Sequence, residues 1–148
     1  WYINFWLQNK MERTLSIIKP DATKRNLSDT INKIIEDNGL KIIAQKKLQL
    51  SVEQAKKFYE IHNDKSFYNN LIEYMSSEPV VVQVLEGDNA IAKYWEIMGS
   101  TDPLHAKEGT IRKQVAISKQ ENSVHGSDSI ENAILEINFF FTKSEILS

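Results

Sequence analysis

Hydrophobic and polar residues follow two different periods along this chain, and the two periods predict its strands and helices. Stretches rich in apolar and β-branched residues, which are typical of strands, occupy residues 13–19, 40–50 and 79–85, and a shorter one occupies residues 115–118. Apolar residues recur at every second position of the second stretch, so they are expected to line one face of a strand. These residues are Leu40, Ile42, Ala44, Leu48 and Leu50.

Apolar residues three or four positions apart predict helices between the strands. The first helix is expected to begin at Ser28 or Asp29, because either side chain can cap a helix, and to end at the Asn-Gly pair of residues 38–39. The second helix is expected to begin at Ser51, which precedes Gln54 with the spacing of a capping box. The apolar residues of the first helix are Ile31, Ile34 and Ile35.

Stripes of apolar residues predict further helices in the rest of the chain. A polar loop interrupted by glycine and proline follows the middle one at residues 99–109, and Asp128 can cap the last one. Trp95 falls on the middle stripe and is therefore expected to pack inward. The stripes are Phe67, Leu71, Tyr74 and Met75; Ile91, Tyr94, Trp95 and Met98; and Ile130, Ala133, Ile134 and Ile137.

The predicted elements follow the order β-α-β-α-α-β-α-loop-β-α, in which helices separate the strands. This order is typical of an α/β sandwich, with helices packed on one sheet. A split β-α-β, ferredoxin-like arrangement is a natural candidate for the topology, although the pattern leaves others open. We find no internal repeat or interdomain linker, so residues 11–148 are expected to form a single domain, which suits a chain of 148 residues.

The first ten residues, WYINFWLQNK, are rich in aromatic side chains and end just before Met11. They lack the basic start, the long apolar stretch and the cleavage site of a signal peptide. We expect residues 1–10 to be a flexible extension that is non-native or encoded upstream, with Met11 as the natural start. An arm that binds a membrane or a partner is the alternative interpretation.

The composition is that of an ordinary globular domain, with 41% hydrophobic and 26% charged residues. The formal net charge of −2 gives no general attraction for nucleic acids, so any anion site has to be local. The chain has no cysteine, which excludes disulfides and cysteine-ligated zinc. No apolar run approaches the roughly 20 residues that cross a bilayer.

Three separate segments contain residues that could move a phosphoryl group. His125 precedes a glycine and a predicted helix start, where a neutral imidazole can act as a nucleophile and free N–H groups favour an anion. Lys19 stands at a strand end, and the guanidinium of Arg112 can bind phosphate through two hydrogen bonds. Taken singly, each residue also fits an ordinary turn or a solvated surface. The sequence has no P-loop, GxGxxG or GxSxG motif, and His62 and His105 lie in plain polar stretches without metal-ligand spacing.

Five segments taken together resemble one family, the nucleoside diphosphate kinases. They occur in the order and spacing of that family, and the pattern NxxHGSDS is highly specific for it. The resemblance extends over residues 12–146 and is greatest with bacterial members. The segments are IKPDATKRN at 18–26, FYNNLIEYM at 67–75, MGSTDP at 98–103, GTIRK at 109–113 and NSVHGSDS at 122–129.

The resemblance implies a ferredoxin-like βαββαβ fold, with a four-stranded antiparallel sheet covered by helices and a long loop before the last strand. It also implies a ping-pong reaction, in which the γ-phosphate of ATP or another nucleoside triphosphate moves to His125 and then to a nucleoside diphosphate. Such a reaction maintains the NTP and dNTP pools. The resemblance further implies Mg²⁺ that arrives with the nucleotide, and a cytoplasmic homotetramer or homohexamer with no membrane or specific nucleic-acid partner.

The same resemblance assigns individual roles to residues of this chain. His125 matches the histidine that reacts through Nδ1, and Phe67 matches the aromatic residue on which the base stacks, with Leu71 nearby in the base cleft. The catalytic positions of the family are matched by His125, Lys19, Glu136, Ser127 and Tyr59. Its nucleotide-binding positions are matched by Lys19, Phe67, Leu71, Thr101, Arg112 and Asn122.

Trp95 departs from the family pattern, which has a phosphate-binding arginine six residues before the threonine matched by Thr101. An indole offers one donor and no charge, so we expect weaker nucleotide binding or slower transfer. A module that binds nucleotides but turns over poorly is therefore an alternative function. Lesser departures are Lys65, Ser66, Glu78 and Lys119.

A nucleic-acid-binding protein is a third possible function. It rests on the lysines near the second predicted strand, Lys41, Lys46 and Lys47, and the net charge disfavours it.

Overall fold

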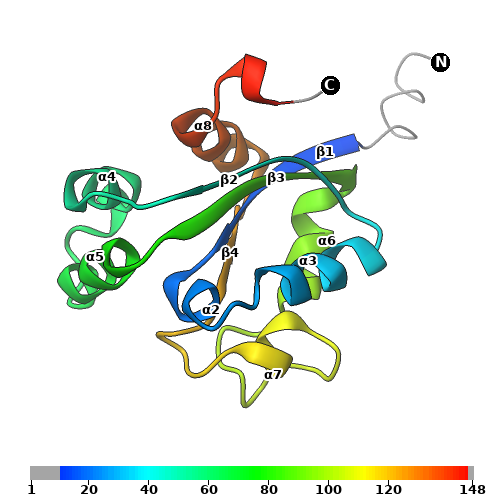
Figure 1. Ribbon diagram of the computed structural model, residues 1–148, viewed down its shortest axis with the longest axis horizontal. Coiled ribbons are helices and arrows are strands. Elements are labelled where there is room, and N and C mark those ends of the chain that lie inside the picture. Colours follow the sequence, from blue (N-terminus) through cyan, green and yellow to red (C-terminus); the bar gives the residue numbers. More distant parts are fainter. Residues whose placement is uncertain (1–10, 147–148) are drawn as a thin grey trace.

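The computed structural model describes residues 11–146, in which helices flank both faces of a four-stranded sheet (Figure 1). The strands lie in the order β2-β3-β1-β4, and every neighbouring pair is antiparallel. This is the ferredoxin-like arrangement, so the predicted fold class is confirmed. The extension predicted at residues 1–10 lies outside the described residues. The strands are β1 (Met11–Ile18), β2 (Lys41–Leu48), β3 (Val80–Asp88) and β4 (Val124–Gly126).

The two faces of the sheet bury separate hydrophobic clusters. On the central strand β1, Leu15 and Ile17 join the cluster under α4, α5 and α8, whereas Ile18 joins the cluster under α2, α3, α6 and α7. This alternation follows from the two-residue period of a strand. The helices are α2 (Pro20–Lys24), α3 (Ser28–Asp37), α4 (Val52–Phe58), α5 (Tyr68–Ser77), α6 (Ala90–Met98), α7 (Ile111–Val115) and α8 (Ile130–Phe140), with 3₁₀ turns η1 (Glu60–His62) and η2 (Lys143–Glu145).

Strand β2 contains a bulge between Ile42 and Ala44 that changes which residues share a face. Leu40 and Ile42 belong to the cluster that includes α3 and α6, whereas Ile43, Ala44 and Leu50 belong to the other cluster. The prediction that alternate residues of this stretch line one face is therefore wrong. An extra residue in one strand of a pair shifts the alternation by one position beyond it.

The last strand does not lie where the apolar pattern predicted it. Residues 115–118 comprise the final residue of α7 and irregular backbone, and β4 instead runs from Val124 to Gly126. Pairing with β1 defines this strand, since Ile17 lies opposite His125 in the register. A three-residue strand is too short to show a period in the sequence. The pairing places His125 beside the central strand of the sheet.

The structure also corrects how two of the predicted helices begin. No side chain caps α3, so neither Ser28 nor Asp29 has the predicted capping role. Helix α8 is capped by Ser129 and not by Asp128. The capping box predicted at Ser51 is present at the start of α4.

Helix α8 rests on the sheet through a narrower stripe than predicted. Ala133, Ile137 and Phe140 are buried, whereas Ile130 and Ile134 are each 55% exposed. Successive residues of a helix are rotated by about 100°, so the positions next to the buried stripe turn toward its edge. Glu136, in the same helix, borders a pocket that His125 also lines.

Candidate active site

The imidazole of His125 is fixed by close packing around β4. A side chain at Gly126 would place a Cβ 2.7 Å from Tyr94 Cδ2 and 2.8 Å from Met98 Cε, so only glycine lets α6 lie this close to the strand. On the other side, the ring of Phe58 contacts the imidazole edge-on, with centroids 5.7 Å apart and an interplanar angle of 73°. The histidine is therefore held between α6 and the α4 side of the sheet.

Glu136 orients the imidazole ring through a hydrogen bond. His125 Nε2 lies 2.9 Å from Glu136 Oε1, and the hydroxyl of Ser127 donates to the same oxygen at 2.8 Å. The Ser127 hydroxyl also accepts from the backbone N–H of Leu15 at 3.2 Å, which ties the group to β1. Because a carboxylate oxygen can only accept, this bond places the ring hydrogen on Nε2 and leaves a lone pair on Nδ1.

His125 lines a pocket of about 240 Å³ between α6, α8 and the segment before β4. Its side chain is 20% exposed, so the ring is accessible but largely enclosed. Five other residues singled out from the sequence also line this pocket. They lie at the end of β1, in α6, in the loop after α6, in α7 and in α8, and they are Lys19, Trp95, Thr101, Arg112 and Glu136. The lining includes Lys19, Trp95, Thr101, Arg112, Glu136, Ile61, His62, Met98, Val124, Gly126, Asp128 and Asn132.

Lys19 brings a buried ammonium group to the pocket. It stands between β1 and α2, where Pro20 occupies the first turn of the helix, and its Nζ donates to Asn122 Oδ1 at 3.0 Å. Only 8% of its surface is exposed. Burial, followed by repulsion from Arg112, lowers the pKa of Lys19 to about 8, while attraction to Asp21 opposes that change. The charge of this lysine is therefore poorly solvated and available to an incoming anion.

Arg112 forms the second cationic wall of the pocket and also holds its backbone together. Its Nε donates to the carbonyl of Asn122 at 3.2 Å, Nη1 to that of Gly99 at 3.0 Å and Nη2 to that of Val124 at 2.8 Å. Burial lowers the pKa of Arg112 from its ordinary value. A guanidinium has five N–H groups, so two remain for a ligand after these three bonds.

Trp95 does not pack inward as predicted. Its side chain is 48% exposed, and its indole N–H donates to the carbonyl of Ser127 at 2.8 Å. Tyr94 and Met98 occupy the buried face of α6, so the neighbouring position turns toward the pocket. Thr101, on the exposed loop that follows, borders the same pocket.

The remaining predicted residues lie around the pocket without all lining it. Tyr59 is buried, its hydroxyl has no hydrogen-bond partner among residues 11–146, and burial together with the charge of Glu136 raises its pKa. Phe67 is 49% exposed at the start of α5, with its ring centroid 5.9 Å from that of His62. Leu71 packs against the hydrophobic cluster beneath α5 and does not line the pocket.

Two aromatic residues of the site were missed by reasoning from the sequence. His62 lines the pocket although it lies in a polar stretch, and Phe58 contacts the imidazole although it reads as an ordinary residue of α4. His62 stands three residues after Tyr59, at helical spacing, which is the one local signal that linked it to the site.

Comparisons with known proteins show the family of the chain. The family model described as nucleoside diphosphate kinase matches residues 12–146. The chain belongs to the nucleoside diphosphate kinase family. Nucleoside diphosphate kinases from Methylobacterium sp. (strain 4-46) and Caulobacter vibrioides (strain NA1000 / CB15N) are 60% and 61% identical to it, over 93% and 92% of this chain and 98% of each relative. The predicted family and its bacterial character are thus confirmed.

Solved structures of the family share the fold. The nucleoside diphosphate kinase of Aquifex aeolicus superposes with a TM-score of 0.90 at 41% identity, covering 93% of this chain and 99% of that one. The Halobacterium salinarum kinase, solved in complex with CDP, gives a TM-score of 0.88 at 34% identity, covering 93% and 91%. The chain is accordingly a phosphotransferase, as predicted. Between residues 11 and 146 no helix is both long and apolar enough to cross a membrane.

Proposed function

We propose that this chain transfers the γ-phosphate of ATP and other nucleoside triphosphates to nucleoside diphosphates, with His125 as the residue that holds the phosphate between the two half-reactions. The observation behind the assignment is the orientation of one imidazole. Glu136 binds Nε2, which leaves the Nδ1 lone pair free, and His125 lines one pocket with Lys19 and Arg112. A ring held in this tautomer has a nucleophilic lone pair next to two cations.

The first half-reaction forms one bond and breaks one. The Nδ1 lone pair of His125 attacks the γ-phosphorus, and the bond from that phosphorus to the bridging oxygen breaks, so that the nucleoside diphosphate leaves with the electron pair. In the second half-reaction a terminal β-phosphate oxygen of the acceptor attacks phosphorus and the P–N bond breaks. Lys19 and the two unused N–H groups of Arg112 stabilise charge on the transferred group in both directions.

A divalent cation would enter this site with the nucleotide. No cluster of three or more potential metal ligands occurs among residues 11–146. Of the carboxylates at the pocket, Glu136 is engaged by His125 and Ser127, and Asp128 accepts a hydrogen bond from Asn132. Such isolated oxygens fit Mg²⁺ held mainly by phosphates, where it would neutralise part of their charge.

The base would lie outside the pocket, near Phe67. The exposed ring of Phe67, beside His62, offers a flat apolar surface at the start of α5. Every base presents a π-face, so stacking discriminates little among nucleotides. This arrangement suits an enzyme that accepts many nucleoside diphosphates.

We expect Trp95 to weaken phosphate binding in this pocket. Its single donor is already used by the carbonyl of Ser127, so it offers no hydrogen bond to a phosphate. One charged hydrogen bond contributes about 1.5–3 kcal/mol, which corresponds to roughly ten- to hundredfold in rate or binding. We expect Trp95→Arg to raise kcat/KM, and an unchanged kcat/KM in a folded variant would contradict the expectation.

Brief incubation with γ-labelled ATP tests the function directly. The intact protein is expected to take up an acid-labile, alkali-stable label, to lose it on addition of GDP, and to take up none as His125→Ala. A label that GDP cannot remove would favour the binding module proposed as the alternative. A chain that takes up no label at all would exclude a ping-pong route through His125.

The oligomeric state stays a prediction. We expect a homotetramer or a homohexamer, which light scattering coupled to size-exclusion chromatography would distinguish from each other and from a monomer.

A further inference from the structure

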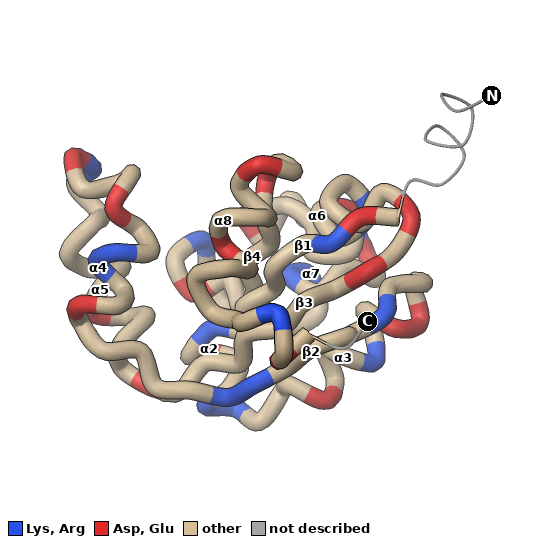
Figure 2. Tube along the Cα trace, turned by 90° about the horizontal axis from the view of Figure 1, so that it is seen from above, with Lys and Arg blue, Asp and Glu red and all other residues tan. Residues whose placement is uncertain are grey.

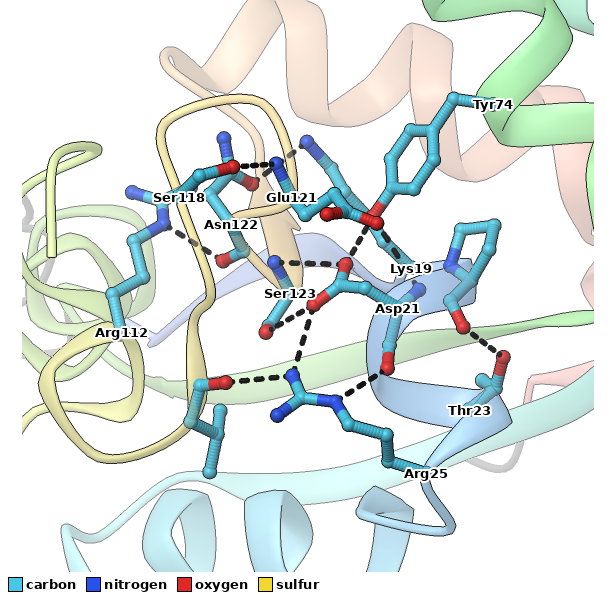
Figure 3. Close-up of polar contacts among 12 residues, drawn as sticks. Lys19, Asp21, Thr23, Arg25, Tyr74, Arg112, Ser118, Glu121, Asn122 and Ser123 are labelled. Carbon is cyan, nitrogen blue, oxygen red and sulfur yellow. Dashed lines mark hydrogen bonds and ion pairs between the residues drawn. The ribbon is translucent and has the colours of Figure 1, made fainter.

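Asp21 is a buried carboxylate whose capacity for hydrogen bonds is filled (Figure 3). Its side chain is 0% exposed. Oδ1 accepts from the hydroxyl of Tyr74 and from the backbone N–H of Ser123, the latter at 3.2 Å. Oδ2 accepts from the Ser123 hydroxyl at 2.7 Å and from Arg25 Nη2 at 3.2 Å. A carboxylate offers about four lone-pair positions, so these four donors occupy all of them.

Two of the donors belong to a residue with an unusual backbone. Ser123 has a φ of 74°, a left-handed conformation that is unfavourable for a residue with a Cβ. Its neighbours on both sides serve the pocket, since Asn122 binds the ammonium of Lys19 and the carbonyl of Val124 binds Arg112. Asp21, by binding both the amide and the hydroxyl of Ser123, holds this turn in place.

Arg25 extends the same network to the helix that carries Arg112. Its Nε donates to the carbonyl of Asp21 at 2.8 Å, and its Nη2 also donates to the carbonyl of Val115 at 2.6 Å. Val115 is the final residue of α7, the helix in which Arg112 lies. Arg25 therefore holds the beginning of the segment between α7 and β4, at Val115, and Asp21 holds its end, at Ser123.

Tyr74 extends the network in the opposite direction, to α5. Burial and its hydrogen bond to Asp21 raise the pKa of Tyr74, so the phenol remains a donor at neutral pH. Its hydroxyl also accepts from the backbone N–H of Asp21 at 3.4 Å. Phe67 begins the same helix, so the contact joins the element that carries the base-stacking surface to the phosphate pocket.

We propose that Asp21 is a positioning residue for phosphoryl transfer. Through Ser123 and Arg25 it sets the segment between α7 and β4, and so aligns the two cations with the imidazole. Through Tyr74 it sets the distance between that pocket and α5. Asp21 does not line the pocket, so it acts only through these neighbours. The inference rests on the proposed role of His125.

The test measures the rate of His125 phosphorylation by γ-labelled ATP, together with the pH dependence of kcat/KM, in the full chain. Asp21→Ala is expected to slow phosphorylation at least tenfold. Asp21→Asn, which keeps the shape and part of the acceptor capacity, is expected to recover part of the rate. Arg112 lowers the pKa of Lys19 and Asp21 raises it. Loss of the Asp21 charge is therefore expected to lower the pKa of Lys19 further and to move the alkaline limb of kcat/KM to lower pH.

A matched control separates positioning from simple loss of stability. Gln83 is fully buried, and its side chain bonds to Gln45, Ser16 and Asn32, none of which lines the pocket. Gln83→Met is expected to lower Tm while leaving both the phosphorylation rate and the alkaline limb within twofold of the parent. A folded Asp21→Ala variant that behaves in the same way would overturn the positioning role.

Tyr74→Phe keeps the proposal testable if Asp21→Ala fails to fold. Removing this one hydroxyl is expected to raise the KM for the nucleoside diphosphate at least threefold, while kcat changes less than twofold. An unchanged KM would overturn the link to α5. A parent chain that takes up no label overturns the proposed function, whereas a labelled parent with unaffected variants overturns only the role of Asp21.

Discussion

Replacing Lys19 by methionine should abolish efficient catalysis and yet stabilise the fold. Burial and Arg112 lower the pKa of Lys19 from 10.5 to about 8, so the charged form is disfavoured in the folded state by about 3 kcal/mol. Methionine keeps the length of the side chain without the charge. It leaves Asn122 Oδ1 without its donor, at a cost of about 1 kcal/mol. We therefore expect the free energy of unfolding to rise by about 2 kcal/mol at pH 7.

The dependence on pH gives this prediction its sharpest form. Between pH 8 and 10.5 the unfolded chain still binds the Lys19 proton that the folded parent has released, so the parent gains stability as pH rises through this window. The methionine variant has no such group. The stability difference between variant and parent should be largest at pH 7 and should shrink steadily up to pH 10.5.

Urea unfolding followed by circular dichroism at pH 7, 8, 9 and 10 measures this difference. Lys57→Met, at an exposed position of α4, is the matched control and should show no comparable pH-dependent difference. A Lys19→Met variant that is no more stable than the parent at pH 7, or whose advantage does not change with pH, would refute the reasoning.

Three further predictions follow from the same pocket. The kcat/KM of the parent should fall above about pH 8, because Lys19 then loses its proton in the free enzyme, and a limb that begins only near pH 10.5 would contradict this. Glu136→Gln should lower kcat by about tenfold with little change in KM, because the ring loses a charged acceptor, and steady-state kinetics would show whether KM changes instead. Gly126→Ala should lower the free energy of unfolding by about 1–3 kcal/mol, measured by urea denaturation, because its Cβ would overlap Tyr94 and Met98.

Much of the fold could be predicted because most of its elements are long enough to show a period. Helices α3, α5, α6 and α8 each bury a stripe that is visible in the sequence, and strands β1 and β3 are recognisable as runs rich in apolar and β-branched residues. Strand β4 could not be found in this way, because three residues show no period and pairing with β1 defines it. The bulge in β2 likewise depends on pairing with β3, and helices α2 and α7, with five residues each, are too short to show a helical period.

The candidate site shows the same division between local and distant information. His125 and Arg112 were recognisable through the family segments, and the structure brings both into one pocket. The orientation of Trp95 could not be predicted from the sequence, because apolar spacing alone does not distinguish the buried edge of a helix stripe from its exposed edge. The role of Asp21 could not be predicted either, because its four hydrogen-bond donors belong to Arg25, Tyr74 and Ser123, which lie 4, 53 and 102 positions away in the sequence.

The tryptophan at position 95 and the network around Asp21 bear on the same physical requirement. With Trp95 bound to a backbone carbonyl, charge stabilisation in the pocket falls to Lys19 and Arg112. Three of the five N–H groups of Arg112 are already engaged by the backbone, so few donors remain for the phosphate. When donors are few, each must stay within about half an ångström of its productive position. The buried network of Asp21 fixes the segments that hold both cations, so its effect on rate should be larger in this chain than in one with a third phosphate-binding side chain.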